Sequence, residues 1–160
     1  MLGEDPGRPR IVTKAQSMAS VSSSYAGDIS ATEAWERLKA DPKAQLVDVR
    51  TTAEWNFVGL PDLSALRRQV HCIEWQSFPS GARNPGFVIE AGQVLADPSA
   101  PVMLLCRSGA RSRAAAIALT EAGFAQAFNI AGGFEGDADE DGHRGNNNGW
   151  KAENLPWSQG

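Results

Sequence analysis

The chain has 160 residues, of which 42% are hydrophobic and 21% are charged, and its formal net charge at pH 7 is −4. This composition is ordinary for a globular protein of one domain with a substantial core. The negative charge and the lack of a basic run argue against nucleic-acid binding. No apolar stretch approaches the roughly 18 residues that span a membrane, so no membrane partner is expected.

The two cysteines, Cys72 and Cys106, are too few for a disulfide framework. The N-terminus also lacks the apolar core of a secretory signal, so a reducing, cytoplasmic location is expected. Residues 1–24 are rich in serine, proline and glycine, and they are predicted to form a disordered tail. Residues 25–160 are predicted to form a single domain.

The first elements of the domain carry two helix-start signals. Ser30 is followed three residues later by Glu33, which is a capping-box pattern and predicts a helix that ends before the next Asp-Pro pair. Residues 45–50 then predict a strand. A second capping-box pattern, formed by Thr51 and Glu54, follows directly.

Residues 69–74 are predicted to form the next strand, in which Cys72 and His71 point to opposite faces. Cys72 is a formal candidate for a resolving cysteine, but we interpret it as buried packing. A loop over 75–85 and a helix over 86–96 follow. Because that loop joins a strand to a helix, its Trp75 and Phe78 either line a substrate entrance or merely anchor the loop.

The most informative stretch is an apolar run, residues 102–105, that ends on Cys106 and precedes an alanine-rich segment, residues 113–122. This order predicts a buried strand, a tight loop and a helix. The free N–H groups at a helix start form a cradle for an anion, and a thiol placed there is drawn towards the thiolate form. Arginines in the loop add positive charge. We therefore interpret Cys106 as a nucleophile rather than an inert core cysteine.

The last part of the domain contains a predicted strand over 124–130 and a glycine pair at 132–133. The acidic run that follows resembles the start of a calcium loop, with aspartates at 137, 139 and 141. Its twelfth position is Asn148 instead of a bidentate glutamate. We therefore expect a solvated loop there and no metal site, and no role is assigned to His143.

The string Cys-Arg-Ser-Gly-Ala-Arg-Ser, residues 106–112, resembles the active-site loop of rhodanese-like sulfurtransferases. In cysteine phosphatases and related arsenate reductases the arginine comes six positions after the cysteine, whereas here Arg111 comes five positions after it. The resemblance therefore implies a shorter loop, sized for a sulfur atom rather than a phosphoryl group.

Two weaker patterns support the same resemblance. Asp48-Val49-Arg50 followed by Glu54 resembles a second rhodanese signature, which implies that Arg50 pairs with Glu54. Asp48 either holds the cysteine loop by accepting N–H bonds or has a structural role in its strand, and we prefer the structural interpretation. The glycine pair resembles the family's closing motif, although the histidine of the family's Gly-His-Ile motif is missing.

The resemblance implies an α/β, three-layer rhodanese-like fold, with a mainly parallel five-stranded central sheet and helices on both faces. It implies a thiosulfate sulfurtransferase-like enzyme that forms a persulfide on the catalytic Cys106. The expected partners are a small anionic sulfur donor and a thiol acceptor, or cyanide in an assay, with no cofactor. The oligomeric state stays open. The loop residues expected to bind substrate are Arg107, Ser108, Gly109, Ala110 and Arg111.

Two other functions stay open at this point. One is a non-catalytic interaction module that uses the same fold as a docking surface. The other, which the short loop disfavours, is a cysteine-dependent phosphatase or arsenate reductase.

Overall fold

The computed structural model of the chain describes residues 24–159. The predicted N-terminal tail therefore lies outside the described residues, except for Ser24. A five-stranded sheet forms the centre of the fold, and all of its neighbouring strands pair in parallel. In spatial order its strands are β1 (Gly27–Ile29), β6 (Gln126–Ile130), β5 (Pro101–Leu105), β2 (Gln45–Asp48) and β4 (His71–Cys72).

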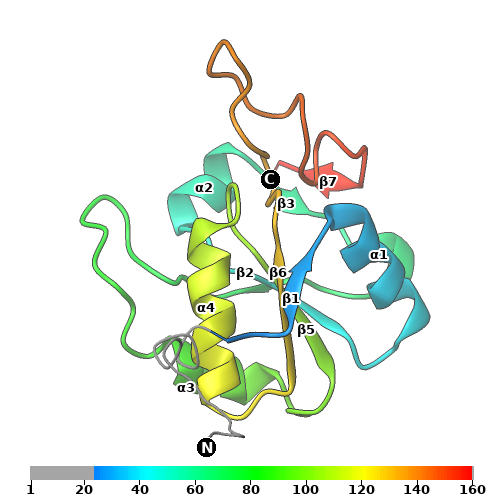
Figure 1. Cartoon of the computed structure of the whole chain (residues 1–160), viewed down its shortest axis with the longest axis vertical. Helices are drawn as coiled ribbons and strands as arrows, with labels where there is room; N and C mark the ends of the chain where they lie inside the picture. The colour runs from blue at the N-terminus through cyan, green and yellow to red at the C-terminus, as the bar shows by residue number, and fades with distance from the viewer. Residues whose placement is uncertain (1–23, 160) are drawn as a thin grey trace, which may run out of the picture.

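Helices cover both faces of this sheet, which confirms the predicted three-layer α/β architecture. In Figure 1, α1 lies on one side of the strands, and α3 and α4 lie on the other. The helices are α1 (Ala31–Ala40), α2 (Thr52–Phe57), α3 (Phe87–Val94) and α4 (Ala110–Glu121), with a 3-10 turn, η2 (Ser64–Leu66). Within the described residues no helix is long and apolar enough to cross a membrane.

Both predicted capping boxes are present. The Ser30 side chain accepts from the Glu33 N–H at the start of α1, and the Glu33 carboxylate accepts from the Ser30 N–H. Thr51 and Glu54 make the same reciprocal pair at the start of α2. These bonds satisfy N–H groups that have no partner inside the helix, so each helix start is fixed by its local sequence.

The alternation of side chains along β5 divides the core into two clusters. Val102 and Leu104 pack with α3 and α4, while Met103 and Leu105 pack on the α1 side. Successive side chains of a strand point to opposite faces. Cys106, the next residue, accordingly belongs to the cluster on the α4 side.

A small antiparallel sheet joins β3 (Leu60–Pro61) to β7 (Trp157–Ser158). It ties the C-terminal segment, orange to red in Figure 1, across the edge where the parallel strands end. Trp150 of this segment is fully buried and packs edge-on against Trp35 of α1. The C-terminal segment is thus part of the core on the α1 side.

Candidate active site

Cys106 lies at the end of β5, where a short loop leads into α4. Its side chain is 1% exposed, and its Sγ accepts a hydrogen bond of 3.1 Å from the N–H of Gly109. Helix α4 begins at Ala110, three residues earlier than the sequence predicted. The sulfur therefore lies against the first turn of the helix, where free N–H groups and the helix dipole favour negative charge.

Only glycine fits at position 109. Its φ is +116°, and a Cβ atom there would overlap the backbone carbonyl oxygen of Ala131. The turn after β6 supports the loop from the same side, because Phe134 N–H donates to the carbonyl oxygen of Cys106 at 2.8 Å. Gly133 of the closing glycine pair lies directly against the backbone of Arg107, where a side chain would not fit. The glycine therefore lets the turn after β6 approach the cysteine loop.

A second donor to the sulfur is Ser112, which sequence analysis did not single out. Its hydroxyl lies 3.2 Å from Cys106 Sγ and 2.6 Å from Oδ1 of Asn129 on β6. The Asn129 amide donates in turn to Asp28 Oδ1, which orients the asparagine so that its oxygen faces Ser112. Because Ser112 has a single proton and two acceptors, that proton is shared between the sulfur and Asn129.

Arg111 of the loop forms a bidentate ion pair with Glu54 of α2, with N–O distances of 2.7 and 2.9 Å. Desolvation is the largest single influence on the pKa of Glu54, and it raises that pKa. The hydrogen bonds and charge of Arg111, together with the hydrogen bonds from Thr51, outweigh it, so the pKa of Glu54 lies below its ordinary value. The pKa of Arg111 is raised, first by its hydrogen bonds to Glu54. The pair holds the loop of residues 106–112, which we call the active loop, against α2.

The expected pairing of Arg50 with Glu54 is therefore wrong. Arg50 instead donates to Asp48 at 2.6 and 2.9 Å, and both side chains are fully buried. Asp48 and Arg50 are two residues apart in extended chain, so they share one face and meet directly. Asp48 also accepts from the Arg50 backbone N–H, which agrees with its predicted structural role.

A pocket of about 640 Å³ opens beside the active loop, and we call it the entrance pocket. Sequence analysis left open whether Trp75 and Phe78 line an entrance or anchor their loop. Phe78 lines the entrance pocket, whereas Trp75 is buried in the core under α3. Of the predicted binding residues, the structure places Arg107 and Arg111 in this pocket. Its lining residues are Thr51, Ala53, Glu54, Phe57, Val58, Phe78, Arg107, Arg111 and Glu135.

Cys72 is exposed, so the prediction that it is buried was wrong. It pairs in register with Asp48, and Asp48 pairs with Leu105, so two strand spacings, roughly 10 Å, separate the strands of the two cysteines. That distance exceeds the reach of a disulfide, and Cys72 also points to the opposite face from Cys106. Partial desolvation, followed by the charge of Asp48, raises the pKa of the Cys72 thiol to about 11.

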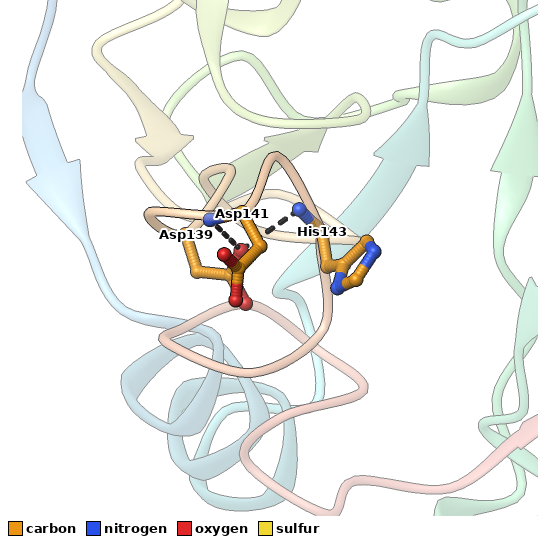
Figure 2. Close-up of side chains that lie close together, drawn as sticks. All are labelled: Asp139, Asp141 and His143. Atoms are coloured by element: carbon orange, nitrogen blue, oxygen red, sulfur yellow. Dashed lines mark hydrogen bonds between the residues drawn. The ribbon is translucent and has the colours of Figure 1, made fainter.

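Figure 2 shows the acidic loop, where Asp139, Asp141 and His143 bring potential ligand atoms within 4.8 Å of one another. The Asp139 carboxylate already accepts from the backbone N–H groups of Asp141 and His143 and from the Asn146 side chain. These hydrogen bonds within the loop explain why the three side chains lie close together. His143 makes no contact with the active loop among the hydrogen bonds of the described residues.

Comparisons with known proteins find relatives over most of this chain. A family model described as the STR4 middle domain matches residues 26–160. The uncharacterized protein RC0915 of Rickettsia conorii is 37% identical over 131 residues, which cover 81% of this chain and 95% of that protein. The chloroplastic rhodanese-like domain-containing protein 4 of Arabidopsis thaliana is 29% identical over 129 residues, which cover 80% of this chain and 25% of that protein.

Two solved structures are similar over most of the chain. The crystal structure of Rv0390 from M. tuberculosis is 52% identical, with a TM-score of 0.79, and the match covers 86% of this chain and 100% of that chain. The solution structure of the polysulfide-sulfur transferase homodimer from Wolinella succinogenes is 25% identical, with a TM-score of 0.60 over 91% of this chain and 85% of that chain. The chain described here therefore belongs to the rhodanese-like family, in the group described as the STR4 middle domain.

Proposed function

We propose that this protein is a sulfurtransferase, in which Cys106 takes a sulfane sulfur from thiosulfate or a similar anionic donor and passes it to a thiol acceptor. Cyanide replaces the thiol in an assay. The observation that carries the proposal is the position of the Cys106 sulfur, which accepts the Gly109 N–H at 3.1 Å at the first turn of α4. A donor aimed at the sulfur stabilises negative charge there throughout the reaction.

In the first step, the Cys106 thiolate attacks the outer sulfur of the donor. A bond forms between the two sulfur atoms, the bond from the outer sulfur to the rest of the donor breaks, and the leaving group departs with that electron pair. With thiosulfate the leaving group is sulfite. The enzyme then holds a persulfide anion on Cys106.

In the second step, an acceptor thiolate attacks the outer sulfur of the persulfide. The bond between Cys106 and the outer sulfur breaks, and its electron pair returns to Cys106 as a thiolate. Both steps exchange one sulfur–sulfur bond for another, so neither requires a cofactor or an oxidant.

Two features of the loop support this chemistry. Ser112 lies 3.2 Å from Sγ and is able to turn its proton towards the sulfur when the charge is on it. Arg107 is exposed at the entrance pocket, where its charge attracts an anionic donor, while Arg111 contributes from its pair with Glu54. The name of the Wolinella succinogenes neighbour, a polysulfide-sulfur transferase, also supports sulfur transfer as the reaction.

The proposal is tested by the mass of the intact protein after it is mixed with a sulfane-sulfur donor, with Cys106→Ser as the control. We expect the wild type to gain one sulfur atom, and cyanide then to remove it as thiocyanate. A protein that gains no sulfur from thiosulfate, polysulfide or an organic thiosulfonate would contradict the proposal. That result would favour a non-catalytic module.

A further inference from the structure

We propose that the physiological sulfur donor is an organic monoanion, in which an apolar body carries the sulfane sulfur, rather than the compact dianion thiosulfate. This inference rests on the proposed function and adds the class of substrate. It is carried by three properties of the entrance pocket: its volume, its exposed aromatic walls and its balance of charge.

The volume of the entrance pocket is far larger than a small inorganic anion requires. At about 640 Å³ it falls within the range of sites that bind whole organic molecules, about 300 to 1,000 Å³. Thiosulfate, whose reacting sulfur carries only a sulfonate group, would fill a small part of this volume. The space beside the loop is therefore available to a larger group attached to that sulfur.

Two large aromatic side chains form the walls of this space. Phe57, the last residue of α2, is 78% exposed, and Phe78, in the loop before α3, is 69% exposed. Both line the entrance pocket together with Val58, although they come from separate parts of the chain. Exposed phenylalanines lose contact with water when an apolar ligand covers them, which stabilises the bound state.

The charges in the entrance pocket sum to zero. Two arginines, Arg107 and Arg111, are matched by two carboxylates, Glu54 and Glu135. Glu54 is bound to Arg111, and among residues 24–159 Arg107 makes no ion pair. Glu135, the second carboxylate of the pocket, makes no ion pair among these residues either, so the pocket offers no net positive charge. Each further charge on a donor would therefore lose its water without gaining a counter-charge, which favours a monoanion over the dianion thiosulfate.

The test compares two donors that share the reacting group R–SO₂–S⁻, the sodium salts of methanethiosulfonate and benzenethiosulfonate. Cys106 takes the outer sulfur from each, and the sulfinate R–SO₂⁻ leaves with the electron pair. Persulfide formation is measured as a second-order rate constant by intact-protein mass. We expect benzenethiosulfonate to react about tenfold faster than methanethiosulfonate, and both to react faster than thiosulfate.

Matched variants separate the pocket from the leaving group. Phe57→Ala combined with Phe78→Ala removes both walls, and Ile89→Ala removes an apolar side chain on α3 that is equally exposed, at 69%, but lies outside the pocket. We expect the preference for the benzene donor to fall to about threefold or less in the double variant and to stay unchanged in Ile89→Ala. The ratio between proteins cancels any difference in leaving-group chemistry.

Each outcome decides one question. An unchanged preference in the double variant, or thiosulfate reacting faster than both thiosulfonates, would overturn the inference while leaving the sulfurtransferase intact. Absence of a persulfide after reaction with all three donors, and with polysulfide as well, would instead reject the proposed function itself.

Discussion

The two cysteines of this chain both lie at the carboxyl ends of strands of the same parallel sheet, with β2 between those strands, yet their surroundings differ. Cys106 follows the central strand β5 and is buried, but its sulfur receives hydrogen bonds from Gly109 and Ser112. Cys72 lies in the edge strand β4 and is exposed. Desolvation and the charge of Asp48 raise the pKa of the Cys72 thiol to about 11, so Cys72 stays a neutral thiol at neutral pH.

Under the proposed function, this difference teaches that a cysteine's nucleophilicity depends on the groups around its sulfur and not on its access to solvent. What distinguishes Cys106 is a set of donors and positive dipoles aimed at the sulfur, which a helix start provides and a strand edge does not. The comparison leads to predictions that test each part of the Cys106 environment in turn.

The largest effect is expected from the two cysteines themselves. Cys106→Ser should lower the rate of persulfide formation by at least about a thousandfold, because it removes the nucleophile. Cys72→Ser should leave that rate unchanged, since Cys72 is on the opposite face of the sheet. Intact mass after reaction with a thiosulfonate measures both, and a persulfide on Cys72 in the Cys106→Ser protein would break the comparison.

The next largest effect is expected at Gly109. Gly109→Ala should lower the rate about a hundredfold by displacing the N–H donor, and it should lower the free energy of unfolding by about 2–4 kcal/mol because its Cβ meets the Ala131 carbonyl. Gly123→Ala is the matched control. Its φ of +107° is similar, but nothing lies within 4 Å of the added Cβ.

For Gly123→Ala we expect a loss of about 1 kcal/mol in the free energy of unfolding and no change in rate. Urea denaturation and the persulfide assay measure the two quantities. Equal rates in the two glycine variants would show that the Gly109 N–H does not act on the sulfur.

Much of the fold was predictable because its signals are local. The capping boxes at Ser30 and Thr51 and the apolar run before Cys106 are each contained in a few consecutive residues. The same holds for the loop that follows Cys106. Family resemblance then supplied the number and direction of the strands.

The features that were missed depend on residues far apart in the sequence. Glu54 and Arg111 are 57 positions apart, and Ser112 and Asn129 are 17 positions apart, so no local pattern indicates these pairs. Cys72 was expected to be buried because the sequence does not reveal that its strand is at the sheet edge. Helix α4 begins at Ala110, earlier than predicted, because Gly109 adopts a positive φ. A glycine in the sequence allows that conformation but does not show that it is adopted.

A smaller effect is expected at Ser112, which has no counterpart beside Cys72. Ser112→Ala should lower the rate of persulfide formation about tenfold, because it removes a hydrogen bond to a charged sulfur and leaves the buried Asn129 oxygen without its donor. Thr120→Ala on the same helix is the control, since its hydroxyl donates only to the Ala116 carbonyl. If both variants react at the wild-type rate, Ser112 has a packing role alone.

The smallest effect concerns the brace that holds the Cys106 loop. Glu54→Gln should lower the free energy of unfolding at pH 7 by about 1–2 kcal/mol, because Arg111 loses its carboxylate partner. Glu36→Gln, which disturbs only an exposed pair with Lys39, is the control and should change it by less than about 0.5 kcal/mol.

The dependence of this loss on pH provides a sharper test of the brace. The pKa of Glu54 is held below its ordinary value of 4.5 in the folded protein, so the wild type gains stability from this carboxylate above that pH and loses it as the pH falls through the folded value. The difference between wild type and Glu54→Gln should therefore be full at pH 7 and shrink below about pH 4. Urea denaturation at several pH values measures it. A difference that stays constant down to pH 3 would mean that the charge of Glu54 does not hold the loop, and that the Cys106 site relies on its backbone contacts alone.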